Sequence, residues 1–364
     1  MMPLRIAVLP GDGIGAEVTT QAVKVIATIA DCFRHEIVMR EYPVGGVALK
    51  THGTPLPEET LSACQASDAV LFGAVGSPEH DDNPPPMKPE AALVQLRLGL
   101  GTFANLRPAV MHPALIDCSP LRPECIQGAD ILIVRELTGG LYTSDPRGID
   151  ATPRGRRGIN TMAYDEAEIE RIARIAFQFA RQRRKKLSSV DKANMLEVSQ
   201  LWREVVTRVS ADYPEVEVEH LLVDNCAMQL IRRPRDFDVI LTENIFGDIL
   251  SEEVAAVLGS IGLLPSASIG EGVSLYEPVH GSAPDIRGKN LANPIGAIGS
   301  VALMFRHSFH LHREADHIES AIWRVLDRGY RTPDLARDGA WVSTEEMGDL
   351  ICREIRRAVE ERPC

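Results

Sequence analysis

The sequence lacks the marks of several protein classes. It has no excess of positive charge, and a net charge of -12 excludes a nucleic-acid binder held mainly by phosphate contacts. Its two basic clusters, 154–157 and 181–186, contain no aromatic residue that could stack on a base. It also has no run of about 20 apolar residues, and the apolar stretch at 6–9 is too short for a signal peptide. We therefore expect no nucleic-acid partner and no membrane segment.

The cysteines lack the spacing of metal sites or disulfide frameworks. The seven form no C-x-x-C pair and no zinc-like pattern. They are Cys32, Cys64, Cys118, Cys125, Cys226, Cys352 and Cys364. An odd, scattered set in a chain of this length suits a reducing compartment. We therefore expect a cytoplasmic protein.

The chain is long enough for two domains or one large α/β unit, since 364 residues exceed the usual size of a single domain. Short apolar runs alternate with helical patterns along it. The expected strands are 6–9, 69–72, 131–134, 187–190 and 238–241, and the expected helices are 16–29, 89–98, 165–182, 193–210 and 246–259. This alternation predicts an α/β fold with a largely parallel sheet covered by helices.

Two segments interrupt the alternation. Residues 76–89 are rich in Pro and Asp, and residues 142–161 combine Gly, Pro and Arg. Both are expected to be irregular. The second is long enough to require a function, such as an active-site lid or an arm that contacts a partner.

A glycine-rich loop follows the first expected strand. Residues 11–16 read GDGIGA, which matches the G-x-G-x-x-G/A fingerprint of dinucleotide-binding Rossmann folds. However, Asp12 and Glu17 would place negative charge near a pyrophosphate, and the second strand ends without a clean acidic partner for a ribose. The alternative is a tight strand-to-helix turn that requires small residues.

Three carboxylates are spaced so that they could bind a divalent cation. Asp248 and Glu252 lie four residues apart, so both leave the same face of one helix. Asp224 follows an apolar run expected to be a strand and could add an oxygen ligand from a separate element. Oxygen ligands are those that Mg²⁺ and Mn²⁺ prefer. The alternative is that Asp248 and Glu252 lie in an exposed N-terminal helix turn, where the helix dipole favours acids.

Six motifs occur in an order that resembles the isocitrate/isopropylmalate family of metal-dependent β-decarboxylating dehydrogenases. They are LPGDGIGAE at 9–17, FANLRP at 103–108, RELTGGLY at 135–142, DKAN at 191–194, the carboxylate segments at 224–230 and 242–252, and HGSAPD at 280–285. The resemblance implies two α/β domains, not a Rossmann fold, with the active site in the cleft between them. Residues 1–102 and 260–364 would form the NAD-binding domain that contains both termini. Residues 103–259 would form the central domain for substrate, metal and dimerisation.

The resemblance also implies site residues. Arg97, Arg107 and Arg135 match the cations that clamp the substrate's carboxylates, a task that suits the planar, permanently charged guanidinium. Asp224, Asp248 and Glu252 match the metal ligands, and Asp224 also borders the substrate. The family usually has Asp where Glu252 stands, so its extra methylene suggests a water-mediated contact. Lys192 would take the hydroxyl proton, and Tyr142 would protonate the enolate carbon. A homodimer with shared active sites is implied, with 142–161 as the interlocking arm.

The implied cofactors are NAD and Mg²⁺ or Mn²⁺. The residues that would contact NAD are Ile14, Glu90, Asn194, His280, Gly281, Ser282, Ala283, Pro284, Asp285, Ile286 and Asn293. Asp285 stands where an acid would hydrogen-bond the adenosine 2′-hydroxyl and repel a 2′-phosphate, so NAD is expected in preference to NADP.

Substrate choice depends on the expected helix at 89–98. Its spacing places Glu90, Leu93, Val94 and Arg97 on one face. If that face lines the cleft, Leu93 and Val94 form an apolar patch that suits an isopropyl group. The resemblance implies the oxidative decarboxylation of a dicarboxylic 2-hydroxy acid, and the patch favours 3-isopropylmalate as that acid, converted to 4-methyl-2-oxopentanoate in leucine biosynthesis.

Other interpretations remain open at this stage. Leu93 and Val94 are alternatively core residues, and a sister activity on tartrate, D-malate or homoisocitrate would also tolerate an apolar wall. A non-catalytic regulatory paralogue is a third possibility, against which the retained arginines, Tyr142 and Lys192 speak. A plain nucleotide-binding module would not require the carboxylates.

Overall fold

The computed structural model describes residues 3–337 and 339–361. Within this part the chain forms two compact units. The first contains the described parts of Met1–Thr102, His112–Pro120 and Leu258–Cys364, and the second contains Phe103–Met111 and Leu121–Val257.

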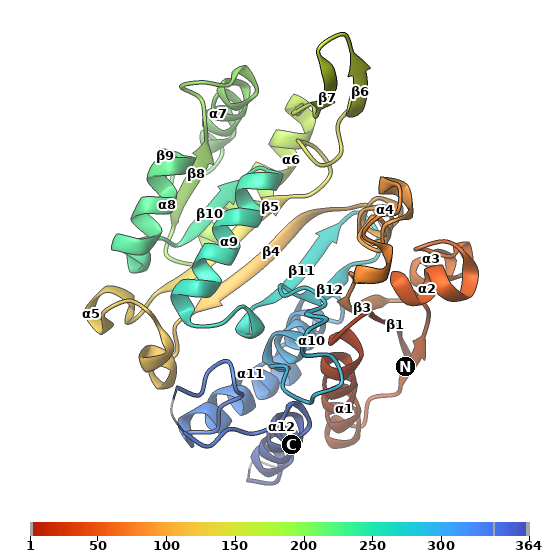
Figure 1. Ribbon diagram of the computed structural model, residues 1–364. Coiled ribbons are helices and arrows are strands. Elements are labelled where there is room, and N and C mark those ends of the chain that lie inside the picture. The colour runs from red at the N-terminus through yellow and green to blue at the C-terminus, as the bar shows by residue number, and fades with distance from the viewer. Residues whose placement is uncertain (1–2, 338, 362–364) are drawn as a thin grey trace. The chain divides into compact units, whose positions relative to one another are not determined.

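The first unit is a helix-covered sheet (Figure 1). Its strands are β1 (Leu4–Gly11), β2 (Ile37–Glu41), β3 (Ala69–Ala74), β11 (Pro265–Gly270) and β12 (Leu275–Pro278). They lie in the order β2-β1-β3-β12-β11, and only the β11–β12 pair is antiparallel. Its α-helices are α1 (Gly15–Phe33), α2 (Gly46–His52), α3 (Glu58–Gln65), α4 (Ala91–Gly99), α10 (Ile295–His307), α11 (His312–Asp327) and α12 (Thr344–Glu361). Its 3₁₀ turns are η1 (Pro78–His80), η2 (Pro85–Met87), η3 (Pro113–Cys118) and η5 (Ile261–Leu263).

The strands of the second unit lie in the order β4-β5-β10-β8-β9. These strands are β4 (Thr102–Val110), β5 (Asp130–Glu136), β8 (Lys186–Asp191), β9 (Glu217–Leu222) and β10 (Val239–Thr242). Only β4–β5 is antiparallel. The helices are α5 (Pro123–Ile126), α6 (Glu166–Gln182), α7 (Glu197–Ser210), α8 (Val223–Arg232), η4 (Pro234–Asp236) and α9 (Asn244–Leu258). A separate hairpin pairs β6 (Gly148–Thr152) with β7 (Gly155–Ile159).

The α6 helix illustrates how sequence determines these elements. Asp165 precedes it and forms a capping box with Glu168, in which each side chain accepts a hydrogen bond from the other residue's backbone N–H. Its apolar residues recur at helical spacing, so Ile169, Ile172 and Phe177 are buried while its charged residues form the outer face. The helix packs against β5, β8 and β10.

The ten strands and helices expected from the alternation are all present, and most of the sheet pairings are parallel. Two boundaries differ by four residues: α1 continues to Phe33 instead of ending at 29, and α7 begins at Glu197, not at Ala193. The later start of α7 has a local reason, because Leu196 has an extended backbone with φ -121 and ψ 126. Residues 76–89 are irregular as expected, apart from the single turns η1 and η2.

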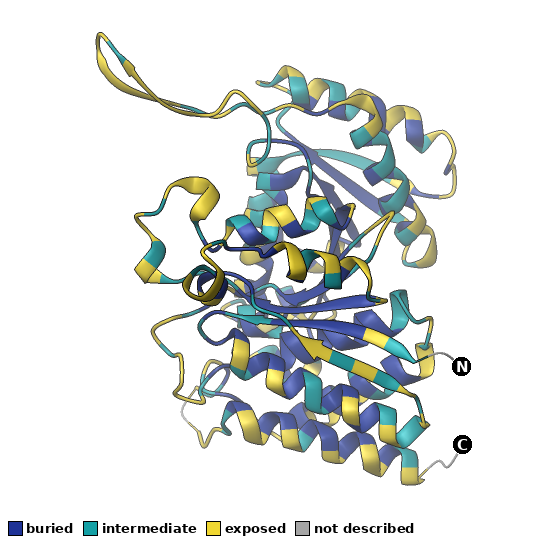
Figure 2. Ribbon diagram, turned by 90° about the vertical axis from the view of Figure 1, so that its right-hand side faces the viewer, coloured by how far each residue is buried: buried dark blue, intermediate teal, exposed yellow. Residues whose placement is uncertain are grey.

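The prediction that 142–161 is irregular is wrong, because residues 148–159 form a hairpin. Thr152 pairs with Gly155 across a two-residue turn at Pro153 and Arg154. The strand residues are almost all exposed, so they have no buried face and no alternation of apolar and polar residues that could have revealed them. Figure 2 shows this hairpin as a long exposed ribbon that projects from its unit.

Residues 112–120 lie in the first unit, whereas the predicted boundaries placed them in the central part of the chain. Arginines after α11 hold this segment. Arg331 donates to the carbonyl of Ala114, and Arg337 donates to that of Ser119 at 2.9 Å.

No helix within the described residues is both long and apolar enough to cross a membrane. The six cysteines among the same residues are free thiols, and Cys364 lies outside them.

Candidate active site

The glycine loop is a tight turn held by its own side chains. Asp12 is 6% exposed and accepts hydrogen bonds from the backbone N–H groups of Gly46, Val47 and Gly76. Gly13 has a φ of +58, and a Cβ there would come within 1.9 Å of the Ser282 carbonyl oxygen. The small residues therefore allow close backbone packing. Like Asp12, Glu17 accepts hydrogen bonds from backbone N–H groups, those of Gly288 and Asn290.

Several residues predicted to contact NAD gather beside this turn. Ile14 donates its backbone N–H to Ser282 at 2.8 Å. A Cβ on Gly76 would lie 2.8 Å from the Ser282 Oγ and 3.2 Å from the Glu90 carboxylate, so these residues are neighbours. A hollow of about 190 Å³ lies alongside, and its lining includes Gly13, Gly76 and Pro284.

His280 has an unused acceptor in a buried position. The residue is 7% exposed, and its Nδ1 lies 2.9 Å from the Gly281 carbonyl oxygen. Burial lowers the pKa of its imidazole, which favours the neutral ring, and in that form Nδ1 donates to this carbonyl and Nε2 is an acceptor. Within the described residues this Nε2 has no partner, which favours a contact with a bound ligand.

Asp285 and Asn293 differ in whether their side chains are already engaged within the protein. Asp285 is exposed, and its carboxylate has no hydrogen bond or ion pair among the described residues. Asn293 is 5% exposed, and its amide is already engaged: Nδ2 donates to Asp334 at 3.0 Å and Oδ1 accepts from the Ile295 N–H. Its contact with adenine stays a prediction. The other predicted cofactor residues, Ala283 and Ile286, are partly buried, whereas Gly281 is exposed.

The predicted substrate face of α4 is partly open. Val94 is 36% exposed, so it is not a core residue, whereas Leu93 packs at the edge of the core cluster that contains Leu96. The Arg97 Nη2 donates to Glu277 at 2.6 Å, with side chains 12% and 7% exposed. The Arg97 Nε is buried and has no partner in the described chain, so this guanidinium retains a donor.

In the second unit, strand pairing places the other two predicted arginines together. Asn105 on β4 lies opposite Arg135 on β5, so both side chains leave the same face of the sheet. Arg107 is two residues beyond Asn105 and leaves that face as well. The α9 helix follows β10, whose Thr242 pairs with Arg135, and Asp248 lies on this helix.

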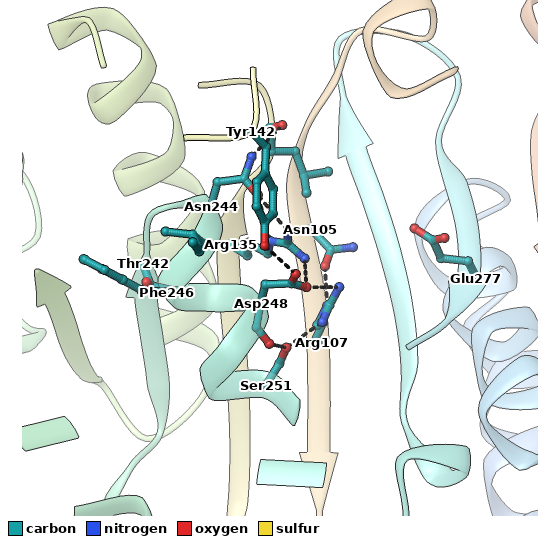
Figure 3. A network of polar contacts seen from close by, with 12 residues as sticks. Asn105, Arg107, Arg135, Tyr142, Thr242, Asn244, Phe246, Asp248, Ser251 and Glu277 are labelled. Atoms are coloured by element: carbon teal, nitrogen blue, oxygen red, sulfur yellow. Dashed lines mark hydrogen bonds and ion pairs between the residues drawn. The ribbon is translucent and has the colours of Figure 1, made fainter. Parts of the chain in front are cut away.

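Asp248 is the centre of a polar network (Figure 3). Its carboxylate accepts from the Arg135 Nη1 at 2.5 Å and lies 3.5 Å from the Arg107 Nη2. The hydroxyl of Tyr142 donates to the other carboxylate oxygen at 3.1 Å. Both guanidinium groups are almost fully buried, while the Asp248 side chain is 30% exposed. Two fixed cations and a phenol therefore converge on one accessible anionic position.

The Tyr142 hydroxyl keeps its proton in this setting. Partial burial and then the adjacent Asp248 carboxylate raise the pKa of Tyr142 above its usual value of 10. The guanidinium of Arg135 lies 5.9 Å from the centre of the Tyr142 ring, which further fixes the ring. The phenol is thus a neutral proton donor at the edge of the network.

Lys192 and Asp224 form a second group. They follow β8 and β9, which are parallel neighbours, so both lie at the same edge of the sheet. The Lys192 Nζ lies 2.9 Å from the Asp224 Oδ2, and this hydrogen bond lowers the pKa of the Asp224 carboxyl. Asp224 lies in the first turn of α8, and its side chain is 66% exposed.

The three predicted metal ligands are not brought together within one chain. No group of three or more His, Cys, Asp or Glu side chains in the described part is placed to hold a metal ion. Asp248 and Glu252 share α9 as predicted, and Glu252 is exposed. The complete ligand set stays a prediction.

The polar residues that hold the arginines and the lysine were not predicted from the sequence. The Arg107 Nε donates to Asn105 at 2.7 Å, and its Nη1 donates to Ser251 at 2.5 Å. Asn244 holds Arg135 in the same way. The loop that carries Lys192 and the exposed Asn194 is anchored at the buried Asp191, which Arg203 contacts through two hydrogen bonds of 2.8 Å.

Comparisons with known proteins find relatives that match nearly the whole chain. Residues 5–351 match the family model described as isocitrate/isopropylmalate dehydrogenase. A 3-isopropylmalate dehydrogenase from Gloeobacter violaceus is 55% identical over 357 residues, covering 97% of this chain and 99% of that protein. One from Aquifex aeolicus is 53% identical over 358 residues, with 98% of each covered.

A solved structure of an isocitrate dehydrogenase also matches the chain. The isocitrate dehydrogenase from Methylococcus capsulatus has a TM-score of 0.88 and 34% identity, covering 97% of this chain and 99% of that one. The family and the fold class expected from the six motifs are thereby confirmed. The chain belongs to the isocitrate/isopropylmalate dehydrogenase family.

Proposed function

We propose that this oxidoreductase converts 3-isopropylmalate to 4-methyl-2-oxopentanoate with NAD, in leucine biosynthesis. The observation that carries the proposal is the convergence of Arg107, Arg135 and Tyr142 on the accessible Asp248 carboxylate. An anionic substrate with a reacting oxygen requires such a combination of cations, a carboxylate and a proton donor. The 3-isopropylmalate dehydrogenases that match the chain at 53% to 55% identity support the choice of substrate.

The residues present fit both implied cofactors. Asp224, Asp248 and Glu252 offer only carboxylate oxygens, the donors that Mg²⁺ and Mn²⁺ prefer, and all three side chains are accessible. The unpartnered Nε2 of His280 and the free carboxylate of Asp285 suit a ligand with hydroxyl and amide donors, such as NAD. When bound, the metal would supply a Lewis acid at the substrate oxygen, and NAD would accept the hydride.

Each protein group then has a distinct task. Arg97, Arg107 and Arg135 bind the two carboxylates of the substrate and orient its reacting carbon. The Nζ of Lys192 takes the proton from the 2-hydroxyl as hydride leaves. After CO₂ departs, the hydroxyl of Tyr142 gives its proton to the carbon that lost the carboxylate.

The proposed site is shared in a homodimer. Within one chain Lys192 and Asp224 pair with each other, whereas Asp248 pairs with Arg107, Arg135 and Tyr142. We infer that Lys192 and Asp224 of one copy complete the site around Asp248 of the other. The exposed hairpin at 148–159 is suited to act as an arm between the copies.

The proposal is tested by following NADH formation with 3-isopropylmalate, D-malate, tartrate and homoisocitrate, each with and without a chelator. We expect the highest kcat/KM with 3-isopropylmalate and loss of turnover in chelator, restored by Mg²⁺ or Mn²⁺. A higher kcat/KM with D-malate or tartrate would mean that Leu93 and Val94 do not form an isopropyl pocket. Full turnover in chelator would exclude a requirement for a divalent metal ion.

The variant Tyr142→Phe tests the proposed proton donor. It keeps the ring and removes the hydroxyl that contacts Asp248, so we expect turnover to fall by about 10²-fold or more while NAD binding stays near that of the parent. Steady-state kinetics and a titration with NAD measure both. Tyr330→Phe is the matched control, because Tyr330 is 38% exposed against 41% for Tyr142 and has no proposed role. Turnover of Tyr142→Phe within tenfold of the parent would contradict the assignment.

A further inference from the structure

Asn244 contacts two separate parts of the candidate site (Figure 3). It begins α9 one helical turn before Asp248, on the same face. Its Oδ1 accepts hydrogen bonds from the Arg135 Nε at 3.1 Å and Nη2 at 2.7 Å. Its Nδ2 donates to the carbonyl oxygens of Leu137 and Gly139, both at 3.1 Å. One side chain thus joins an arginine of the site to the segment that leads to Tyr142.

The amide can face only one way. A guanidinium offers only donors and the two carbonyls offer only acceptors, so Oδ1 must face Arg135 and Nδ2 must face Leu137 and Gly139. All four hydrogen-bonding positions of the amide are used, and the residue is 2% exposed. A buried polar group that is fully satisfied in this way holds its neighbours in one arrangement.

The segment that Asn244 holds contains Gly139 and Gly140, and it also packs against Tyr164. A Cβ on Gly139 would come within 2.5 Å of the Tyr164 ring, and one on Gly140 within 2.3 Å of its hydroxyl. That hydroxyl accepts the backbone N–H of Asn244 at 2.9 Å and donates to Glu243 at 3.2 Å. The turn therefore lies between the Tyr164 ring and the Asn244 amide, and Tyr142 follows it directly.

Arg135 is confined as well. A Cβ on Gly247 would lie 2.8 Å from the Arg135 Cγ, so the side chain passes closely over the first turn of α9. Its guanidinium then lies between the Asn244 Oδ1 and the Asp248 carboxylate. The oxygen of Asn244 thereby sets the plane of the fork that would meet a substrate carboxylate.

We propose that Asn244 is a positioning residue with two separable tasks: its Oδ1 orients Arg135 for the substrate, and its Nδ2 holds the turn that places Tyr142. The inference rests on the proposed function, since that assigns substrate binding to Arg135 and proton transfer to Tyr142. The two tasks use different atoms, so different substitutions affect different kinetic constants.

Two variants separate the tasks. Asn244→Asp keeps an oxygen for Arg135 but turns a second oxygen toward two carbonyls, which destabilises the turn. We expect its kcat to fall about tenfold or more, while KM for 3-isopropylmalate stays within about threefold. Asn244→Ala removes both atoms, so we expect the same loss in kcat together with a rise in KM of about tenfold.

The control is Gln65→Glu, the same chemical change at an exposed amide that donates to the Gly99 carbonyl at 2.9 Å; we expect parent-like kinetics. Thermal melting checks folding, and if Asn244→Asp does not fold, Asn244→Ala decides alone. A folded Asn244→Asp with kcat within threefold of the parent, or Asn244→Ala with both constants within threefold, overturns the inference. A parent chain without activity overturns the proposed function instead, so the two failures are distinguishable.

Discussion

Replacing Lys192 with alanine is expected to lower turnover by about 10²-fold or more, with NAD affinity almost unchanged. The reason is that Lys192 is the proposed acceptor of the hydroxyl proton, and its Nζ is held 2.9 Å from Asp224 at the edge of the sheet. No other lysine ends a neighbouring strand of that sheet in the described residues. Steady-state kinetics with saturating substrate and a separate NAD titration measure the two quantities.

The control for this variant lies on the same strand. Lys186 starts β8, and its Nζ is 3.6 Å from Glu219, so Lys186→Ala removes a lysine with a carboxylate partner from outside the proposed site. We expect it to retain parent-like turnover, because such a half-exposed pair contributes little. A Lys192→Ala protein with turnover within tenfold of the parent would assign the proton transfer to another group.

Replacing Asp248 with asparagine is expected to lower kcat/KM by more than about 10²-fold and to raise the Mg²⁺ or Mn²⁺ concentration needed for half-maximal activity. The substitution keeps the shape of the side chain and an oxygen that accepts from Arg135, while the amide nitrogen would donate to the Tyr142 hydroxyl instead of accepting from it. It removes the negative charge that a divalent cation requires. A titration of activity against metal concentration, with a melting curve as the folding check, measures the effect.

Two further variants serve as comparisons for Asp248→Asn. Asp212→Asn neutralises an exposed acid that pairs with Arg174 at 3.0 Å, and we expect no change in the metal titration. Glu252→Gln should have a smaller effect than Asp248→Asn, because Glu252 has an extra methylene and is exposed. Equal metal requirements for the parent and Asp248→Asn would exclude Asp248 as a ligand.

The strands and helices could be predicted from the sequence because burial controls their patterns. Residues 6–9 of β1 and all of β3 are buried runs, and α6 has both a capping box and an amphipathic face. The hairpin at 148–159 could not be predicted, since neither of its faces is buried and its pairing leaves no hydrophobic period. Pairing partners are also non-local, and only coordinates place Asn105 opposite Arg135.

Parts of the candidate site could be predicted where motif residues carry an ionisable side chain. Arg107, Arg135, Tyr142 and Asp248 were named from the sequence, and the structure brings them together. Asn244 carries no charge, and its importance depends on its contacts with Arg135, Leu137 and Gly139. A buried amide in a sequence is indistinguishable from a helix-capping residue, so its role required coordinates.

Lys192 and Asp224 of one copy are proposed to act with Asp248 of another, and mixed dimers test this arrangement directly. Lys192→Ala and Asp248→Asn chains are co-expressed with different affinity tags, and the mixed dimers are purified. In a shared arrangement one of the two sites in each mixed dimer keeps both residues, so we predict about half of the parent's turnover per dimer. Mixed dimers no more active than the two variant homodimers would show that the sites are not shared between copies.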